Sequence, residues 1–176
     1  MVAYHGRRLS EAVSALDSAI NLDPLMDIAY AVRALAKSRL GDQVGALNDA
    51  QAARRVAEDP VFAEATLAVV EVAKGDTAAG RARTEALVAA SLRQRSVTVE
   101  EGVWVAYALA AVGDHRLAIE VLDRVQPRGG HLFLDMRSPH FDALRRDPRF
   151  HRIAAEARPP DARSGNAPTR RASRFR

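Results

Sequence analysis

Apolar residues recur at helical spacing along most of this chain. Between Leu9 and Ile20 they fall at positions i, i+3, i+4 and i+7, and the stripe ends at Leu22-Asp23-Pro24. The stretch from Tyr30 to Ala53 reads as two further amphipathic helices joined at Gly41-Asp42. The pattern therefore predicts an all-α protein built from short helices.

A Gly-Asp pair punctuates this pattern at Gly41, Gly75 and Gly113. The first two pairs are about 34 residues apart, and the interval to the third is slightly longer. Each pair follows an Ala-rich apolar stretch and precedes another helical one. Glycine suits the positive φ at which many helices end, and an aspartate that follows it can accept hydrogen bonds from the free amides of the next helix. Repetition at such an interval predicts stacked helical hairpins, not one closed core.

A helix-turn-helix unit of about 34 residues is the period of the tetratricopeptide repeat, and the chain resembles that family. Positions that the family fills with an aromatic, a small residue, the turn glycine and three small packing residues are occupied here by Tyr30, Ala34, Gly41, Ala46, Ala50 and Ala53. The resemblance implies an α-solenoid of antiparallel helix pairs over residues 1–128. Its units would be a partial one at 1–24 and further ones at 27–60, 61–95 and 97–127, the second helix of the third unit running long, to about Arg95.

Residues 129–157 depart from the repeat and are expected to form a C-terminal helical cap. Ser138-Pro139 and Asp147-Pro148 predict helix starts, and large apolar side chains follow them at Phe141, Leu144, Phe150 and Ile153. The stretch resembles the end of long bacterial tetratricopeptide proteins, in which the repeats follow a protein kinase, nucleotide cyclase or winged-helix domain. A stack of repeats also needs a terminal element with a polar outer face.

The first repeat lacks most of its first helix, because only Met1 to His5 precede Gly6. We therefore expect either that the chain begins upstream or that a partner covers Leu9 to Ile20. A second copy of the chain, forming a homo-oligomer, is one such partner.

Composition and charge narrow the class of protein. With 176 residues, 48% apolar content and no cysteine, the chain fits one domain in a reducing compartment, and we expect a cytoplasmic protein. The longest apolar run, Val103 to Val112, is about half of the roughly 20 residues that a membrane span requires. The net charge is +4, but residues 158–176 hold six Arg and one Asp, so the remainder carries −1. Nucleic-acid binding thus rests on a basic tail that we expect to be disordered, and it is disfavoured.

Sequence motifs for catalysis are missing: the chain has no cysteine, no Gly-x-Ser-x-Gly, no phosphate-binding loop and no His-Glu-x-x-His. The histidines His5, His115, His131, His140 and His151 lack metal-ligand spacing. We therefore expect neither an enzyme nor a bound cofactor or metal.

The candidate site is a groove. In the family, the first helices of successive repeats line a concave surface, and here these are Tyr30 to Leu40, Phe62 to Lys74 and Glu100 to Val112. Seven residues are predicted to point inward: Leu35, Arg39, Phe62, Val69, Val72, Val103 and Tyr107. An apolar trough with one basic group suits an amphipathic helix or an extended peptide. Two alternatives stay open: that some of these residues are inter-helix core, or that the cap folds back over them. Trp104 is expected in the core.

These features predict a non-catalytic scaffold that binds another protein or peptide in its groove. The alternative is the C-terminal sensor region of a larger signalling protein. Family members that grip acidic chaperone termini use several Lys, Asn and Arg residues, and only Arg39 matches here, which disfavours that role.

Overall fold

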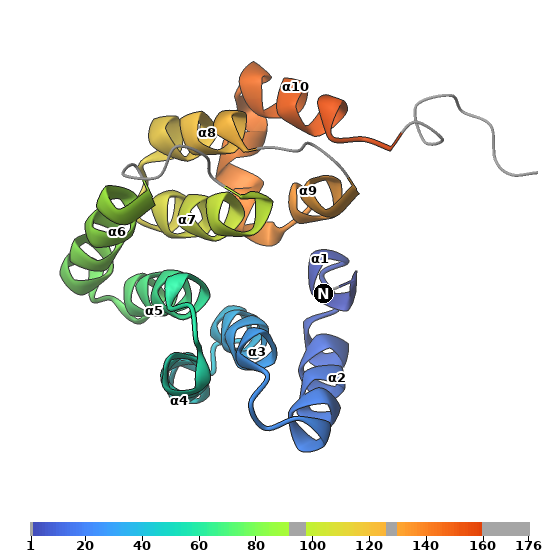
Figure 1. Ribbon diagram of the computed structural model, residues 1–176, viewed down its shortest axis with the longest axis vertical. Helices are drawn as coiled ribbons and strands as arrows, with labels where there is room; N and C mark the ends of the chain where they lie inside the picture. Colours follow the sequence, from blue (N-terminus) through green and yellow to red (C-terminus); the bar gives the residue numbers. More distant parts are fainter. Residues whose placement is uncertain (1, 92–97, 126–129, 160–176) are drawn as a thin grey trace, which may run out of the picture.

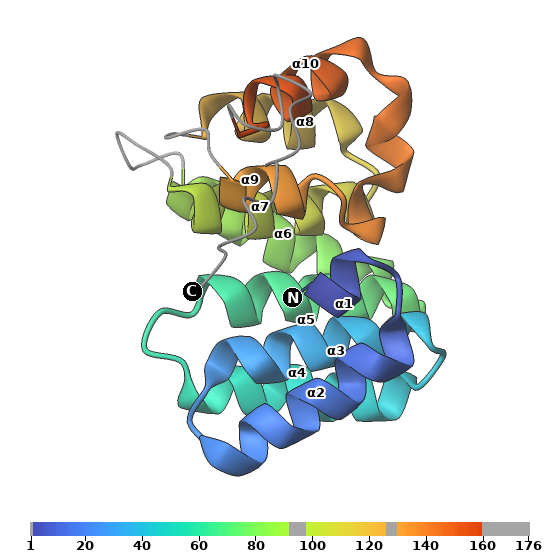
Figure 2. The same cartoon turned by 90° about the vertical axis from the view of Figure 1, so that its right-hand side faces the viewer.

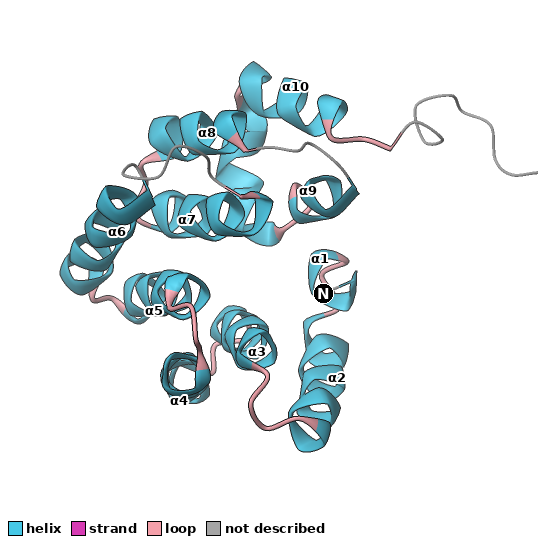
Figure 3. Ribbon diagram, viewed as in Figure 1, coloured by secondary structure: helices cyan, strands magenta, loops and turns pink. Residues whose placement is uncertain are grey.

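The computed structural model describes residues 2–91, 98–125 and 130–159, and every element in this part of the chain is a helix (Figure 3). In order the helices are α1 (Val2–His5), α2 (Leu9–Leu22), α3 (Asp27–Arg39), α4 (Gln43–Val56), α5 (Val61–Lys74), α6 (Thr77–Ser91), α7 (Val99–Ala111), α8 (His115–Arg124), α9 (Gly130–Asp135), the 3₁₀ helix η1 (Pro139–Arg146) and α10 (Pro148–Glu156). The all-α prediction is confirmed. The expected extension of α6 to Arg95, and the tail from residue 160 onward, lie outside the described residues. No helix in the described ranges has the length and apolarity of a membrane span.

The three Gly-Asp turns share one geometry. Gly41, Gly75 and Gly113 have φ angles of 89°, 101° and 86°. In each turn the aspartate amide donates to the carbonyl five residues earlier and the glycine amide donates to the carbonyl three residues earlier, the Schellman pattern. The aspartate carboxylates then accept from the amides of Gly45, Ala79 and Leu117. Both roles predicted for the pair, helix stop and N-cap, are confirmed.

Neighbouring helices pack in pairs. α3 contacts α4, α5 contacts α6 and α7 contacts α8, while α3, α5 and α7 also contact one another in succession. Figure 1 shows these three helices in an inner row, with α4 and α6 on the outer side. Ala46, Ala50 and Ala53 on α4 are completely buried, so small side chains allow the helices to approach closely.

Arginine-centred ion pairs link adjacent helices. Arg33 on α3 donates to both carboxylate oxygens of Asp49 on α4, at 2.8 and 2.7 Å, and to Asp17 on α2 at 2.7 Å. Arg83 on α6 makes the same two-pronged contact with Glu71 on α5, at 3.0 and 2.8 Å, and also reaches Glu64. These contacts fix the register of each helix against its neighbour.

The C-terminal segment folds as three short helices, and the predicted starts are confirmed. The side chain of Ser138 accepts from the amide of His140 at the start of η1, and that of Asp147 accepts from the amide of Arg149 at the start of α10. α9 contacts both α7 and α1. Figures 1 and 2 place α1 between α2 and α9, so the start of the described chain lies close to its C-terminal segment.

Candidate functional site

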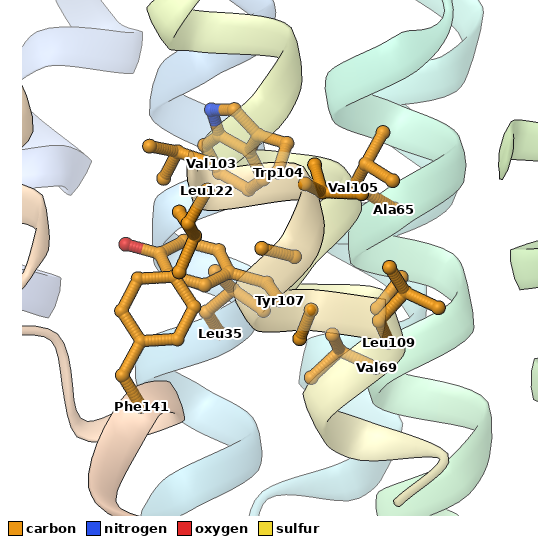
Figure 4. Close-up of a cluster of buried hydrophobic side chains, with 14 of the residues drawn as sticks. Leu35, Ala65, Val69, Val103, Trp104, Val105, Tyr107, Leu109, Leu122 and Phe141 are labelled. Carbon is orange, nitrogen blue, oxygen red and sulfur yellow. The ribbon is translucent and has the colours of Figure 1, made fainter. Parts of the chain in front are cut away.

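The inner face, defined as the side of α3, α5 and α7 that faces α1, α9 and η1, is largely filled. Of the predicted groove residues, Leu35, Val103 and Tyr107 are 1%, 2% and 1% exposed. Phe62 is half-buried and its ring lies 5.4 Å from that of Trp104. Figure 4 shows Leu35, Val69, Val103 and Tyr107 in one cluster with Phe141. Trp104 is buried, as predicted.

The cap is what covers these residues. The rings of Phe141 and His140 on η1 lie 4.8 and 5.0 Å from the ring of Tyr107. Tyr107 does point inward, but it packs against the cap and is not free to touch a ligand. This corrects the expectation of an open trough along its whole length: Leu35, Val103 and Tyr107 belong to the core.

Helix α1 also packs against the cap. Tyr4 is 1% exposed and its ring stacks on that of His140 at 6.0 Å. Nε2 of His5 lies 3.1 Å from Oδ1 of Asp135 on α9, within ion-pair distance but without the alignment of a hydrogen bond. Arg7, two residues after the end of α1, pairs with Asp142 of η1. Contacts from Tyr4, His5 and Arg7 therefore join the start of the described chain to the cap.

One part of the inner face stays open as a cleft of about 550 Å³ near the C-terminal ends of α3, α5 and α7. From the predicted groove it keeps Arg39, Val69 and Val72. The remaining lining residues are Ser38, Ala73, Ala110, Ala111, Pro139, His140, Asp142 and Ala143. The cleft therefore has apolar walls from α5 and α7 and polar groups from α3 and η1.

Charges of both signs border the cleft. Arg39 is exposed and makes no ion pair with any described residue. Burial tends to raise the pKa of Asp142, but hydrogen bonds from Arg7 and Arg145 outweigh it and lower that pKa. Asp142 is therefore a paired carboxylate at neutral pH, whereas the guanidinium of Arg39 is available to an acidic group.

Behind the cleft lies a buried polar cluster formed by Tyr4, Tyr107, Ser138 and His140. The hydroxyls of both tyrosines and Nε2 of His140 are enclosed without a well-formed hydrogen bond to any described residue. Burial raises the pKa of Tyr4 and of Tyr107, while the nearby Ser138 hydroxyl opposes the rise. Burial, and then the positive charge of Arg39, lowers the pKa of His140 to about 3. All of these groups are thus neutral at pH 7, and none is a ready proton acceptor in exchange with solvent.

Within the described ranges, no group of three or more His, Asp or Glu side chains is placed to hold a metal ion. His115 is exposed in the first turn of α8.

The sequence did not reveal the part played by Tyr4, His5 and His140. A signal was available, because only 5% of the residues are aromatic and the doublets Tyr4-His5 and His140-Phe141 stand near opposite ends of the chain. No helical period connects them, so their contact could not be read from local pattern.

Comparison of the chain with family models, curated proteins and solved structures gave no match.

Proposed function

We propose that this chain is a non-catalytic protein-binding scaffold, an α-solenoid of tetratricopeptide type, and that the cleft holds a segment of another protein. The repeat assignment is supported by the three Gly-Asp turns, which share φ, hydrogen bonds and caps and recur at nearly equal intervals along the chain. It is also supported by the succession of α3, α5 and α7 along one face.

The cleft carries the functional proposal. Val69, Val72 and Ala73 of α5 give it an apolar wall, and Arg39 of α3 puts at its edge a cation without an ion-pair partner among the described residues. Apolar walls with a few polar groups at fixed positions are the general form of a recognition site. A peptide would bury apolar side chains on α5 and place a carboxylate against Arg39.

Photo-crosslinking tests this proposal. Ala73 is exposed and lines the cleft, whereas Ala78 is an exposed alanine in the first turn of α6 and does not line it. A photoreactive residue is introduced at each position and activated in cells that make the protein. We expect a discrete protein adduct at Ala73 and not at Ala78, and we expect Arg39→Glu to reduce it. Equal adducts at both positions, or none at Ala73, would contradict the proposal.

A further inference from the structure

Helix α1 is held against the inner face by side chains that reach across the molecule. Tyr4 stacks on His140, His5 faces Asp135 and Arg7 pairs with Asp142. The hydrogen bond between Arg7 and Asp142 spans 135 positions of the sequence. The three partners belong to α9 and η1, so α1 occupies a site that the cap presents.

The hold on α1 is incomplete in two respects. The hydroxyl of Tyr4 and both ring nitrogens of His5 are buried without a hydrogen-bond partner in the described chain, and such groups lose their bonds to water without full replacement. The connection from α1 to α2 is also strained, because Arg7 has a φ of 62°, a conformation that side chains other than glycine and asparagine adopt at a cost. Both features lower the free energy needed to release α1.

We infer that α1 is a pseudo-ligand, bound in cis where a partner protein docks a segment with a tyrosine followed by cationic residues. This rests on the proposed function, since it names the partner chemistry for the same inner face. His140 lines the cleft and also stacks on Tyr4, so the position of α1 and the cleft are continuous.

The chemistry of the occupant follows from the residues that hold α1. The ring of Tyr4 stacks on the ring of His140, and the hydroxyl of Tyr4 lies near the hydroxyl of Ser138. The carboxylate of Asp135 lies opposite His5 and that of Asp142 lies opposite Arg7, and both favour positive charge at these positions. A partner would therefore carry an aromatic hydroxyl with a cation beside it and a second cation further on.

Occupation in cis changes the affinity that a partner experiences. A ligand that binds only when α1 is released has an apparent affinity equal to its intrinsic affinity multiplied by the fraction of molecules in which α1 is released. Removing the side chain that anchors α1 should then raise affinity for a segment supplied in trans.

A synthetic peptide tests this directly. A dye-labelled peptide with the sequence of residues 2–10 is titrated against the full chain carrying Tyr4→Ala, the wild-type chain and a Tyr30→Ala control. Tyr30 is a half-buried tyrosine on α3 that lies against Arg33, not in the site. A second peptide carries Tyr4→Ala itself. We expect the Tyr4→Ala chain to bind the parent peptide at least about tenfold more tightly than it binds the alanine peptide. The wild-type and Tyr30→Ala chains should bind the parent peptide more weakly than the Tyr4→Ala chain does.

Equal binding of the two peptides by a folded Tyr4→Ala chain would overturn the inference, as would equal affinity of all three chains. If Tyr4→Ala loses its helical circular dichroism, both peptides are titrated into the wild-type chain, where preference for the parent peptide supports the inference and equal binding overturns it. A wild-type dimer that Tyr4→Ala abolishes would make a second copy the occupant and overturn the partner assignment. An adduct at Ala73 without peptide selectivity would leave the proposed function standing and remove this inference alone.

Discussion

At the scale of single residues, Gly80 marks a close approach between α5 and α6. A Cβ at this position would lie 2.5 Å from Cγ2 of Val72 and 2.8 Å from the carbonyl oxygen of Ala68. The carbonyl belongs to a helix and cannot move away by a change of rotamer. Glycine at this position therefore has a steric reason.

We therefore expect Gly80→Ala to lower the free energy of unfolding by about 1 kcal/mol, because the overlap outweighs the better helix propensity of alanine. Urea denaturation monitored by circular dichroism measures this. Glu85→Ala at an exposed position of the same helix is the control and should change stability little. A Gly80→Ala chain more stable than wild type would show that α6 can move away from α5.

Ala50 is fully buried on α4, which packs between α3 and α5. Ala50→Leu should cost about 1 to 3 kcal/mol through overpacking, whereas Gln51→Leu at the adjacent exposed position should cost little. Thermal melting of the two variants separates these outcomes. Equal melting temperatures would mean that the α4 face assigned to packing is wrong.

At the scale of elements, the two helix pairs carry the same ion pair with its signs exchanged. Lys37 and Asp49 pair across α3 and α4 at 2.9 Å, and Glu71 and Arg83 pair across α5 and α6 at 2.8 Å. The two pairs occupy the same positions relative to their turn glycines, Gly41 and Gly75. At the corresponding positions around Gly113, buried Leu109 and Val121 replace the charges. The three helix pairs thus share a contact position and differ in the chemistry that fills it.

This equivalence predicts coupling between Glu71 and Arg83. Arg83→Asp should lower the free energy of unfolding by about 2 kcal/mol, because it leaves Glu71 without its charged donor and leaves Glu64 with Arg54 alone. Adding Glu71→Lys recreates the arrangement of the preceding pair and should recover part of the loss. A double-mutant cycle by urea denaturation gives the coupling energy. Additive single and double effects would show that Glu71 and Arg83 are not energetically coupled.

The elements were largely readable from the sequence, and their arrangement at the site was not. Apolar period, Gly-Asp pairs and Pro-containing starts are local signals, and they predicted the helices from α2 to α8, the starts of η1 and α10, and the caps at the three Gly-Asp turns. The filling of the inner face depends on contacts such as that of Tyr4 with His140, which join the two ends of the chain. Such contacts leave no periodic trace, so the cap's position over Tyr107 stayed one of two open alternatives until the structure placed it.

At the scale of the whole molecule, His140 lies where α1, α7 and η1 meet, in contact with the rings of Tyr4 and Tyr107. Its Nε2 is enclosed although the residue as a whole is only half-buried. Burial is the main cause of its lowered pKa of about 3; the charges of Arg39 and His5 act in the same direction, and Asp142 opposes them. The contacts that His140 makes with α1 and α7 therefore depend on its imidazole being neutral.

The sign of the pH effect follows from proton binding. Below the unfolded pKa of about 6.5 the unfolded chain takes up a proton at His140 that the folded chain refuses until about pH 3, so acid favours unfolding across this window. Between pH 7 and pH 5.5 the wild-type chain should lose about 1 kcal/mol more stability than a His140→Phe chain, which keeps an aromatic ring without a titrating group. Urea denaturation of both chains at the two pH values measures the difference, above the range in which most carboxylates titrate. Parallel losses in the two chains would mean that His140 takes up its proton in the folded state, and that the contact between α1 and the cap tolerates a charged imidazole.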